Sequence, residues 1–359
     1  MKKIGVLIVE DSRVITQLLC HIIGGDPRFD ILAAVSSAEE ALEILQRVSP
    51  DVISLDIRLP GMNGLEVTRR IMQDKPTPIV VCSASVESDE LKITMNALRA
   101  GALAVVEKPV GTTRAEYEQL ARTLCTQLAI MSDVKVVRQR GFTDSATPFK
   151  KTVESPKILF GTRVTQGRPV HRFLGIGAST GGPNAVVQVL TGLGRDLPFP
   201  VLLVQHMMPS FLAGFVSWLE GVTPWRAVIA RNHEVPVPGT VYLAPPDHHL
   251  EIEADRIRLT QDPPISAQRP SATVLFRSMA RDLGGAALGI LLTGMGDDGA
   301  DGLLELRRTG GYTIAEHEST AVVYGMPKAA VDRGAACECL PLNEIAPRVL
   351  EMVSTEAVR

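Results

Sequence analysis

Short apolar runs alternate with amphipathic segments along the first third of the chain. This alternation is typical of a parallel sheet whose strands are connected by helices. It predicts five strands, five helices and a complete doubly wound α/β domain over residues 1–130. The apolar runs are Ile4–Val9, Ile31–Val35, Val52–Leu55, Ile79–Cys82 and Ala104–Val106. The helical stretches include Ser12–Ile23, Ala38–Val48 and Leu91–Ala100.

The pattern breaks between residues 131 and 171. Within this segment, Val137 to Lys151 are polar and basic without a sustained apolar period, and prolines interrupt the rest. Such a composition predicts an interdomain linker over residues 131–171. A short amphipathic stretch around residues 130–137 is expected to extend the last helix of the first domain.

The alternation resumes after Arg172, which predicts a second and larger doubly wound parallel-sheet domain over residues 172–355. Its apolar runs are Phe173–Gly177, Val201–Gln205, Val228–Ala230, Val241–Ala244, Leu288–Leu292 and Tyr312–Ala315. Its helical stretches include Asn184–Leu190, Phe211–Leu219, Ala272–Leu283 and Gly302–Thr309.

Composition and charge narrow the choice of partners and location. The chain of 359 residues is 45% hydrophobic and 21% charged, which is ordinary for a soluble globular protein. A formal net charge of -3 argues against nucleic acid as a partner. The apolar run near the N-terminus is shorter than a signal peptide requires, and no run is long enough to insert into a bilayer. Five scattered cysteines fit free thiols in a reducing compartment, so we expect a cytoplasmic protein.

Acidic side chains follow two strands of the first predicted domain, at the edge where parallel sheets bind ligands. Glu10 and Asp11 come directly after the first strand, and Asp56 follows the third. Three carboxylates at one edge repel one another unless a cation is present, and such oxygen ligands suit Mg²⁺. At the same edge, Ser83 ends the fourth strand and Lys108 follows the fifth, as phosphoryl transfer to an aspartate requires. The simpler alternative is that acidic residues only cap the following helices, as Asp11 is placed to do.

These residues resemble the response-regulator receiver family, a flavodoxin-like fold. The resemblance rests on Val9-Glu10-Asp11-Ser12, Leu55-Asp56-Ile57-Arg58-Leu59-Pro60-Gly61 and Glu107-Lys108-Pro109. It implies Asp56 as the phospho-acceptor, Glu10, Asp11 and Asp56 as Mg²⁺ ligands, and Ser83 and Lys108 as contacts to the phosphoryl oxygens. Receivers usually carry an aromatic switch residue three positions before the lysine, where this chain has Val105. We therefore expect phosphorylation to be read out by another route.

A glycine-rich turn opens the second predicted domain. Gly177-Ala178-Ser179-Thr180-Gly181 follows an apolar strand, has the G-x-S-x-G form and leads into a helix with Pro183 in its first turn. Small flanking residues allow a tight turn that exposes the Ser179 hydroxyl, and N–H groups at the helix start can stabilise an oxyanion. A dinucleotide-phosphate site is disfavoured because Thr180 stands at the last position of G-x-G-x-x-G.

A histidine and two aspartates follow other strands of the same domain. His206 comes directly after Val201–Gln205, and Asp297 and Asp298 lie just after Leu288–Leu292. All three side chains therefore fall on the same edge of one parallel sheet as Ser179. An imidazole can take the serine proton, and a carboxylate behind it fixes the tautomer. Taken singly, each residue is better explained as a strand-end histidine or a solvated loop carboxylate.

This half of the chain is similar to the chemotaxis protein-glutamate methylesterase family. The resemblance rests on Ile176-Gly177-Ala178-Ser179-Thr180-Gly181-Gly182, Gln205-His206-Met207, Arg269-Pro270-Ser271, Leu292-Thr293-Gly294-Met295-Gly296-Asp297-Asp298-Gly299-Ala300 and Val323-Tyr324-Gly325-Met326-Pro327. It implies Ser179 as nucleophile, His206 as general base, Asp298 as the orienting carboxylate, and the backbone N–H groups of Thr180 and Met295 as the oxyanion hole. The segment Arg269-Pro270-Ser271 is expected to line the cleft, and His248 or His249 to be a structural loop residue.

Together the two resemblances imply a phosphorylation-regulated enzyme of two-component chemosensory signalling. It would hydrolyse glutamate methyl esters, and deamidate glutamines, on methyl-accepting chemoreceptors, and a chemotaxis-type histidine kinase would phosphorylate Asp56. The esterase reaction would need no cofactor. One competing hypothesis is a receiver joined to a non-catalytic binding domain. A DNA-binding output is disfavoured because no helix-turn-helix or basic recognition helix follows Arg172.

Overall fold

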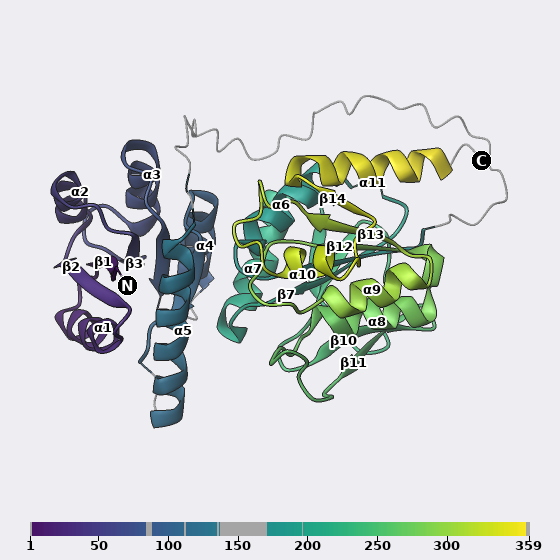
Figure 1. Ribbon diagram of the computed structural model, residues 1–359, viewed down its shortest axis with the longest axis horizontal. Helices are drawn as coiled ribbons and strands as arrows, with labels where there is room; N and C mark the ends of the chain where they lie inside the picture. Colours follow the sequence, from purple (N-terminus) through teal and green to yellow (C-terminus); the bar gives the residue numbers. More distant parts are fainter. Residues whose placement is uncertain are drawn as a thin grey trace.

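The computed structural model describes residues 2–83, 88–110, 113–134, 136, 171–195 and 197–356. Most of the predicted linker, including the far end of the expected helix extension at 130–137, lies outside these residues. The described residues form two α/β domains that lie side by side (Figure 1). No described helix has the length and apolar character needed to cross a membrane.

The predicted five strands and five helices of the N-terminal domain are confirmed. Its five-stranded parallel sheet has the order β2-β1-β3-β4-β5. The strands are β1 (Ile4–Val9), β2 (Phe29–Val35), β3 (Val52–Asp56), β4 (Ile79–Ser83) and β5 (Ala104–Glu107). The helices are α1 (Arg13–Gly25), α2 (Ala38–Arg47), α3 (Gly64–Asp74), α4 (Ser88–Arg99) and α5 (Arg114–Ser132).

Side-chain caps define where these helices begin. Ser12, Ser37, Asn63 and Thr113 each accept a backbone N–H from the first turn of α1, α2, α3 and α5, which satisfies a donor that the helix itself leaves unpaired. Because Ser12 is the cap of α1, the alternative reading of Asp11 as that cap is wrong. Asp11 therefore lies at the sheet edge without a helix-capping role.

The predicted parallel sheet of the C-terminal domain is also confirmed. Seven parallel strands have the order β14-β13-β12-β6-β7-β9-β8. They are β6 (Phe173–Ala178), β7 (Val201–Gln205), β8 (Arg226–Ile229), β9 (Thr240–Leu243), β12 (Ala287–Leu291), β13 (Tyr312–Glu316) and β14 (Glu338–Leu340). The helices are α6 (Gly182–Leu193), α7 (Pro209–Val222), α8 (Ala272–Asp282), α9 (Ala300–Arg308), α10 (Met326–Asp332) and α11 (Leu342–Glu356).

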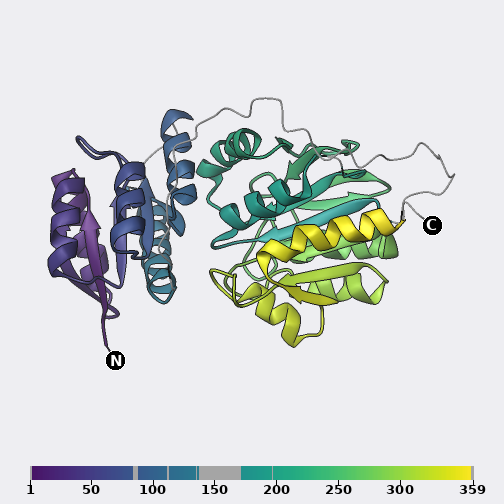
Figure 2. The same cartoon turned by 90° about the horizontal axis from the view of Figure 1, so that it is seen from above.

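Helices cover both faces of this sheet (Figure 2). Helices α6, α7 and α11 contribute to one buried apolar cluster, and α8, α9 and α10 to the other. The chain runs from β6 to β7 on one side and from β12 to β13 on the other. The edge between β6 and β12 is therefore the topological switch point, where open α/β sheets bind their ligands.

An antiparallel hairpin that the sequence pattern did not predict stands beside the sheet. It consists of β10 (His249–Glu253) and β11 (Arg256–Thr260). The two residues of its turn, Ala254 and Asp255, have φ values of 47° and 62°. A tight hairpin turn usually places asparagine or glycine at such positions, so the sequence lacked the signal that normally marks one.

The two domains contact each other through α4. This helix packs against α7 and, less extensively, against α6 (Figure 1). One continuous buried apolar cluster runs from the α2, α3 and α4 face of the first domain into the α6, α7 and α11 face of the second. Asn184 Nδ2 also donates to the carbonyl oxygen of Leu98, at 2.7 Å.

Candidate active site

The predicted nucleophile, Ser179, lies on a tight turn between β6 and α6. The turn requires glycine at position 181, where φ is 77° and a Cβ atom would lie 2.6 Å from the Val322 side chain. The Ser179 N–H donates to the carbonyl oxygen of Thr293, 3.0 Å away. The carbonyl oxygen of Ser179 accepts from Gly182 N–H. Ser179 is thus held by its backbone, and its half-buried side chain stands at the carboxyl edge of the sheet.

The loop after β12 packs directly against this turn. A Cβ atom on Gly294 would lie 2.7 Å from Ser179 Cβ and would also overlap Met326 Sδ, so only glycine fits. Thr293 Oγ1 donates to the carbonyl oxygen of Thr180, at 2.8 Å. The neighbouring Met295 is 54% exposed. Among the backbone hydrogen bonds of the described residues, neither Thr180 N–H nor Met295 N–H is a donor, so both are available to an external oxygen.

His206 lies at the end of the adjacent strand, β7. Its Nε2 is 2.9 Å from Asp298 Oδ2, and its backbone N–H donates to the carbonyl oxygen of Ala178. With Nε2–H directed at the carboxylate, Nδ1 is the ring nitrogen left to accept a proton. No hydrogen bond is recorded between Ser179 Oγ and His206 within the described chain, but both residues line one cavity. Catalytic contacts of this kind often tighten only when substrate binds.

Asp298 is the aspartate that the structure brings to His206. It is 2% exposed, and its carboxylate faces the N-terminus of α8. There it accepts hydrogen bonds from Ser271 Oγ (2.5 Å), Ala272 N–H (2.7 Å) and Thr273 N–H (3.2 Å). Burial alone would raise its pKa, but His206 and these donors outweigh burial and hold the pKa below the usual value. Asp298 is therefore a well-anchored carboxylate behind the imidazole.

Asp297, by contrast, points to a more exposed site. Its carboxylate pairs with Arg333 Nη2 at 2.6 Å and accepts from Ser266 Oγ at 3.1 Å. The hydrogen bond from Arg333 lowers the pKa of Asp297 despite partial burial. The two neighbouring aspartates thus have separate partners.

Three supporting residues had no assigned contact in the sequence analysis. Gln205 Nε2 donates to the carbonyl oxygens of Ser179 and His206, at 2.8 and 2.9 Å, and so ties the two strand ends together. Ser271, expected to line the cleft, is fully buried and holds Asp298 instead. His249, expected in a loop, is the buried first residue of β10, and its Nδ1 accepts the Ser271 N–H at 3.2 Å. His248 lies in the exposed loop before β10, as expected.

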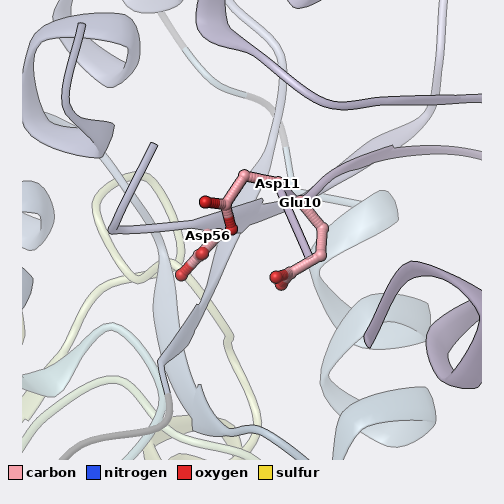
Figure 3. Close-up of side chains that lie close together, drawn as sticks. All are labelled: Glu10, Asp11 and Asp56. Atoms are coloured by element: carbon pink, nitrogen blue, oxygen red, sulfur yellow. The ribbon is translucent and has the colours of Figure 1, made fainter. Parts of the chain in front are cut away.

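The predicted acidic site of the first domain is also assembled. Ligand oxygens of Glu10, Asp11 and Asp56 all lie within 4.8 Å of one another, and Figure 3 shows the three side chains close together. Lys108 Nζ is 2.7 Å from Glu10 Oε2 and 3.0 Å from Asp56 Oδ2. Three carboxylates facing one ammonium leave an excess of negative charge, so this acidic cluster is typical of a Mg²⁺ site.

Burial sets the electrostatics of this cluster. It raises the pKa of both Glu10 and Asp56, although Lys108 opposes the shift. Burial would lower the pKa of Lys108, but the two carboxylates outweigh it and raise that pKa. Ser83 is fully buried at the end of β4, and its carbonyl oxygen accepts the Lys108 N–H at 2.9 Å. All five residues predicted for phosphoryl transfer therefore come from neighbouring strand ends.

A cavity of about 370 Å³ separates the two domains at the second site. The C-terminal domain contributes Ser179, Thr180 and His206 to its wall. The N-terminal domain contributes residues of α4, β5 and α5, including Val105. The face that carries β5 therefore covers the candidate active site.

Comparisons with known proteins find relatives of both domains. The family model described as CheB methylesterase matches residues 174–349, and the model described as response regulator receiver domain matches residues 6–118. A protein of Paramagnetospirillum magneticum named protein-glutamate methylesterase/protein-glutamine glutaminase 2 is 56% identical over 98% of both chains. One of Nitrosospira multiformis with the same name, without the number, is 41% identical over 98% of this chain and 97% of its own length.

Among solved structures, the crystal structure of the Thermotoga maritima CheB methylesterase catalytic domain is 31% identical. It covers 52% of this chain and 98% of its own, with a TM-score of 0.48. The identity and coverage of the curated relatives extend across both domains. The chain therefore belongs to the CheB methylesterase family, in which a receiver domain precedes the methylesterase domain.

Proposed function

We propose that this chain is a receiver-regulated protein-glutamate methylesterase and protein-glutamine glutaminase that acts on methyl-accepting chemoreceptors. The observation that carries the proposal is the pairing of buried Asp298 with His206, which lines the same cavity as Ser179. Family membership supplies the substrate class. The competing idea of a non-catalytic binding domain offers no reason for a buried carboxylate behind a histidine at this place.

The proposed reaction has two halves, acylation of Ser179 and hydrolysis of the acyl-enzyme, and the same groups act in both. Ser179 Oγ attacks the side-chain carbonyl carbon while His206 Nδ1 takes its proton, and Asp298 stabilises the imidazolium. The N–H groups of Thr180 and Met295 stabilise the oxyanion. The imidazolium then protonates the leaving group, which departs as methanol from an ester or ammonia from an amide. Water then attacks the acyl-enzyme carbonyl carbon while His206 takes its proton. The imidazolium passes that proton to Ser179 Oγ as the ester bond breaks, which releases glutamate and restores the serine.

The direct test supplies the full-length protein with methylated receptor fragments and with fragments that carry glutamine at the same positions. Methanol release from the first and ammonia release from the second are the expected results. Fragments with alanine at those positions are the matched control. Binding of the fragments without release of either product would support the competing binding-domain hypothesis.

The first domain is proposed to control access to this site. A chemotaxis-type histidine kinase would phosphorylate Asp56, with Ser83 and Lys108 contacting the phosphoryl oxygens. Mg²⁺, held by Glu10, Asp11 and Asp56, would supply the positive charge that brings the phosphodonor and the carboxylate together. We assign the receiver to residues 1–130, a linker to 131–171 and the methylesterase domain to 172–355. A cytoplasmic location follows from the proposed kinase partner.

Phosphorylation is expected to raise turnover of receptor substrate because the covering face of the receiver moves away from the cavity. A coupling free energy of about 1–3 kcal/mol corresponds to a rise of about 5- to 150-fold. The measurement is methanol release from wild type and Asp56→Asn, each with and without a small phosphodonor and Mg²⁺. Asp56→Asn should keep the low rate under both conditions. Equal stimulation of the two proteins would remove Asp56 from the control of this enzyme.

Because Val105 is not an aromatic switch residue, the phosphorylation signal needs another route from Asp56 to the active site. One interdomain hydrogen bond offers such a route. Ser210 Oγ, in the first turn of α7, donates to Glu107 Oε2 at 3.0 Å. Glu107 is the neighbour of Lys108, and Ser210 follows His206 by four positions. A shift of Lys108 toward a phosphoryl group would therefore act directly on this contact.

Ser210→Ala is expected to raise the unphosphorylated rate by about 2- to 10-fold, the effect of losing one net hydrogen bond from the closed form. The maximal phosphorylated rate should stay the same, so the degree of activation falls. Ser217→Ala, on the exposed side of the same helix, is the matched control. An unchanged basal rate in Ser210→Ala would show that the apolar contacts of α4 hold the domains together without this bond.

A further inference from the structure

Glu316 is a buried carboxyl group that the proposed mechanism does not use. It is the last residue of β13 and is fully inaccessible to solvent. Its Oε2 accepts the Thr293 N–H at 2.8 Å. Thr293 follows β12 and precedes Gly294, which lies against Ser179. The carboxyl group therefore contacts the loop that packs on the nucleophile turn.

Thr293 connects this carboxyl group to the reacting residues. Its carbonyl oxygen accepts the Ser179 N–H at 3.0 Å, and its hydroxyl donates to the carbonyl oxygen of Thr180 at 2.8 Å. The same hydroxyl accepts the Val323 N–H at 2.9 Å. The orientation of the Thr293 residue thus influences both Ser179 and the carbonyl group of Thr180, the residue whose N–H is proposed for the oxyanion hole. Glu316 is two hydrogen bonds away from each.

The surroundings of Glu316 favour a neutral carboxylic acid. Its Oε1 is buried without a hydrogen bond of ordinary geometry, although the Thr320 hydroxyl is close enough to favour ionisation slightly. Burial raises the pKa of Glu316 to about 7, and the Thr293 N–H only partly opposes the shift. Cys339 on β14 lies against the Glu316 carbonyl oxygen, at 3.9 Å, with the Tyr324 hydroxyl 4.0 Å beyond its sulfur. Neither of these groups is cationic.

The basic side chains on the described elements packed around β13 have other partners or, like Arg308 of α9, are exposed. Arg307 of α9 donates to the carbonyl oxygens of Gly334 and Ala336. Lys328 of α10 pairs with Asp332, and Arg348 of α11 with Glu338. Since a buried carboxylate needs a cation or several donors to remain charged, ionisation of Glu316 would be costly here.

We propose that Glu316 is a positioning residue whose neutral carboxyl group holds the Thr293 peptide and thereby fixes Ser179 and the oxyanion hole for reaction. This inference rests on the proposed function. The group does not touch substrate and acts only through Thr293. Ionisation at alkaline pH would place an uncompensated charge beneath the loop and loosen it. Glutamine, which has the same shape and accepts the same N–H but cannot ionise, should replace Glu316 without this pH sensitivity.

The test compares wild type, Glu316→Gln and Glu316→Ala, with exposed Glu318→Gln as control, in kcat and KM between about pH 6 and pH 9. Glu316→Ala is expected to lose about 10-fold or more in kcat with little change in KM, because substrate contacts remain. Glu316→Gln should match wild type near pH 6 and exceed it increasingly above pH 7, where wild type ionises. Wild-type kcat in Glu316→Ala, or a ratio of Gln to wild-type rates that is flat with pH, would overturn the proposal.

A stability measurement separates this role from the proposed activity. The pKa of Glu316 is raised on folding, so the folded state binds the proton more tightly, and its cost of burial grows as pH rises from the ordinary value toward about 7. The Tm advantage of Glu316→Gln over wild type should therefore be larger near pH 8 than near pH 5. Labelling of Ser179 by a small serine-directed probe reports positioning without any receptor substrate. If wild type releases no product, the proposed function fails, while unequal labelling of wild type and Glu316→Ala still supports positioning and equal labelling rejects it.

Discussion

Ser179→Ala is expected to lower methanol release by about 10⁴- to 10⁶-fold, because the variant lacks the hydroxyl that is proposed to form the acyl-enzyme. Water activated by His206 would attack the ester only slowly, since the bound nucleophile gains its advantage from being held beside the carbonyl carbon. The variant should fold normally: the Ser179 backbone makes the hydrogen bonds that hold the turn, and alanine keeps them. It should also still bind receptor fragments.

The measurement is single-turnover methanol release, with Tm and fragment binding as checks on folding. Labelling by a serine-directed probe should disappear in Ser179→Ala and persist in Ser217→Ala. A Ser179→Ala rate above about 1% of wild type would show that the hydroxyl is not the nucleophile. Water would then be the attacking group, and the site would need a different mechanism.

Asp298→Asn is expected to lower turnover by about 10⁴-fold, the usual cost of losing the carboxylate behind a catalytic histidine. The asparagine side chain has an NH₂ group in place of one carboxylate oxygen. If this group faces His206 Nε2, the imidazole loses its correct tautomer. If it faces the donors of α8, the start of that helix loses an acceptor. Because the carboxylate accepts four hydrogen bonds, stability should also fall, by about 1–3 kcal/mol.

The neighbouring aspartate gives a matched control. Asp297→Asn removes the pair with Arg333 at a partly exposed position and should change turnover only a few-fold. If the rate losses of the two variants were similar, the assignment of the orienting role to Asp298 would be wrong. Denaturation curves of both proteins separate the loss of stability from the loss of rate.

Much of the fold could be predicted because the strands of both sheets are buried apolar runs with polar residues at their ends. Glu10, Asp56, Ser179 and His206 all mark the point where such a run stops. The β10–β11 hairpin was missed for a physical reason, since Ala254 and Asp255 adopt left-handed conformations without the residues that usually signal them. The three-residue β14 is too short for its pattern to distinguish it from a loop.

The supporting residues were harder to foresee than the reacting ones. Gln205 is 26 positions from Ser179, and Ser271 is 27 positions from Asp298, so only the packed sheet brings each pair together. Glu316 ends an otherwise ordinary strand and gives no sign in the sequence that its carboxyl group is enclosed. The spacing of apolar runs in the sequence identifies the residues at strand ends. Contacts through the interior cannot be predicted in this way, because they depend on which strands are neighbours in the sheet.

The cavity between the domains has a consequence for how the resting protein filters molecules by size. At about 370 Å³, the cavity can hold a small ester or a covalent inhibitor, whereas a receptor helix is about 10 Å wide with its side chains. The reactivity of Ser179 and the access of the natural substrate to the cavity are thus separate properties. The unphosphorylated protein should already react with small reagents. Phosphorylation by the kinase would control only the access of a substrate as large as a helix.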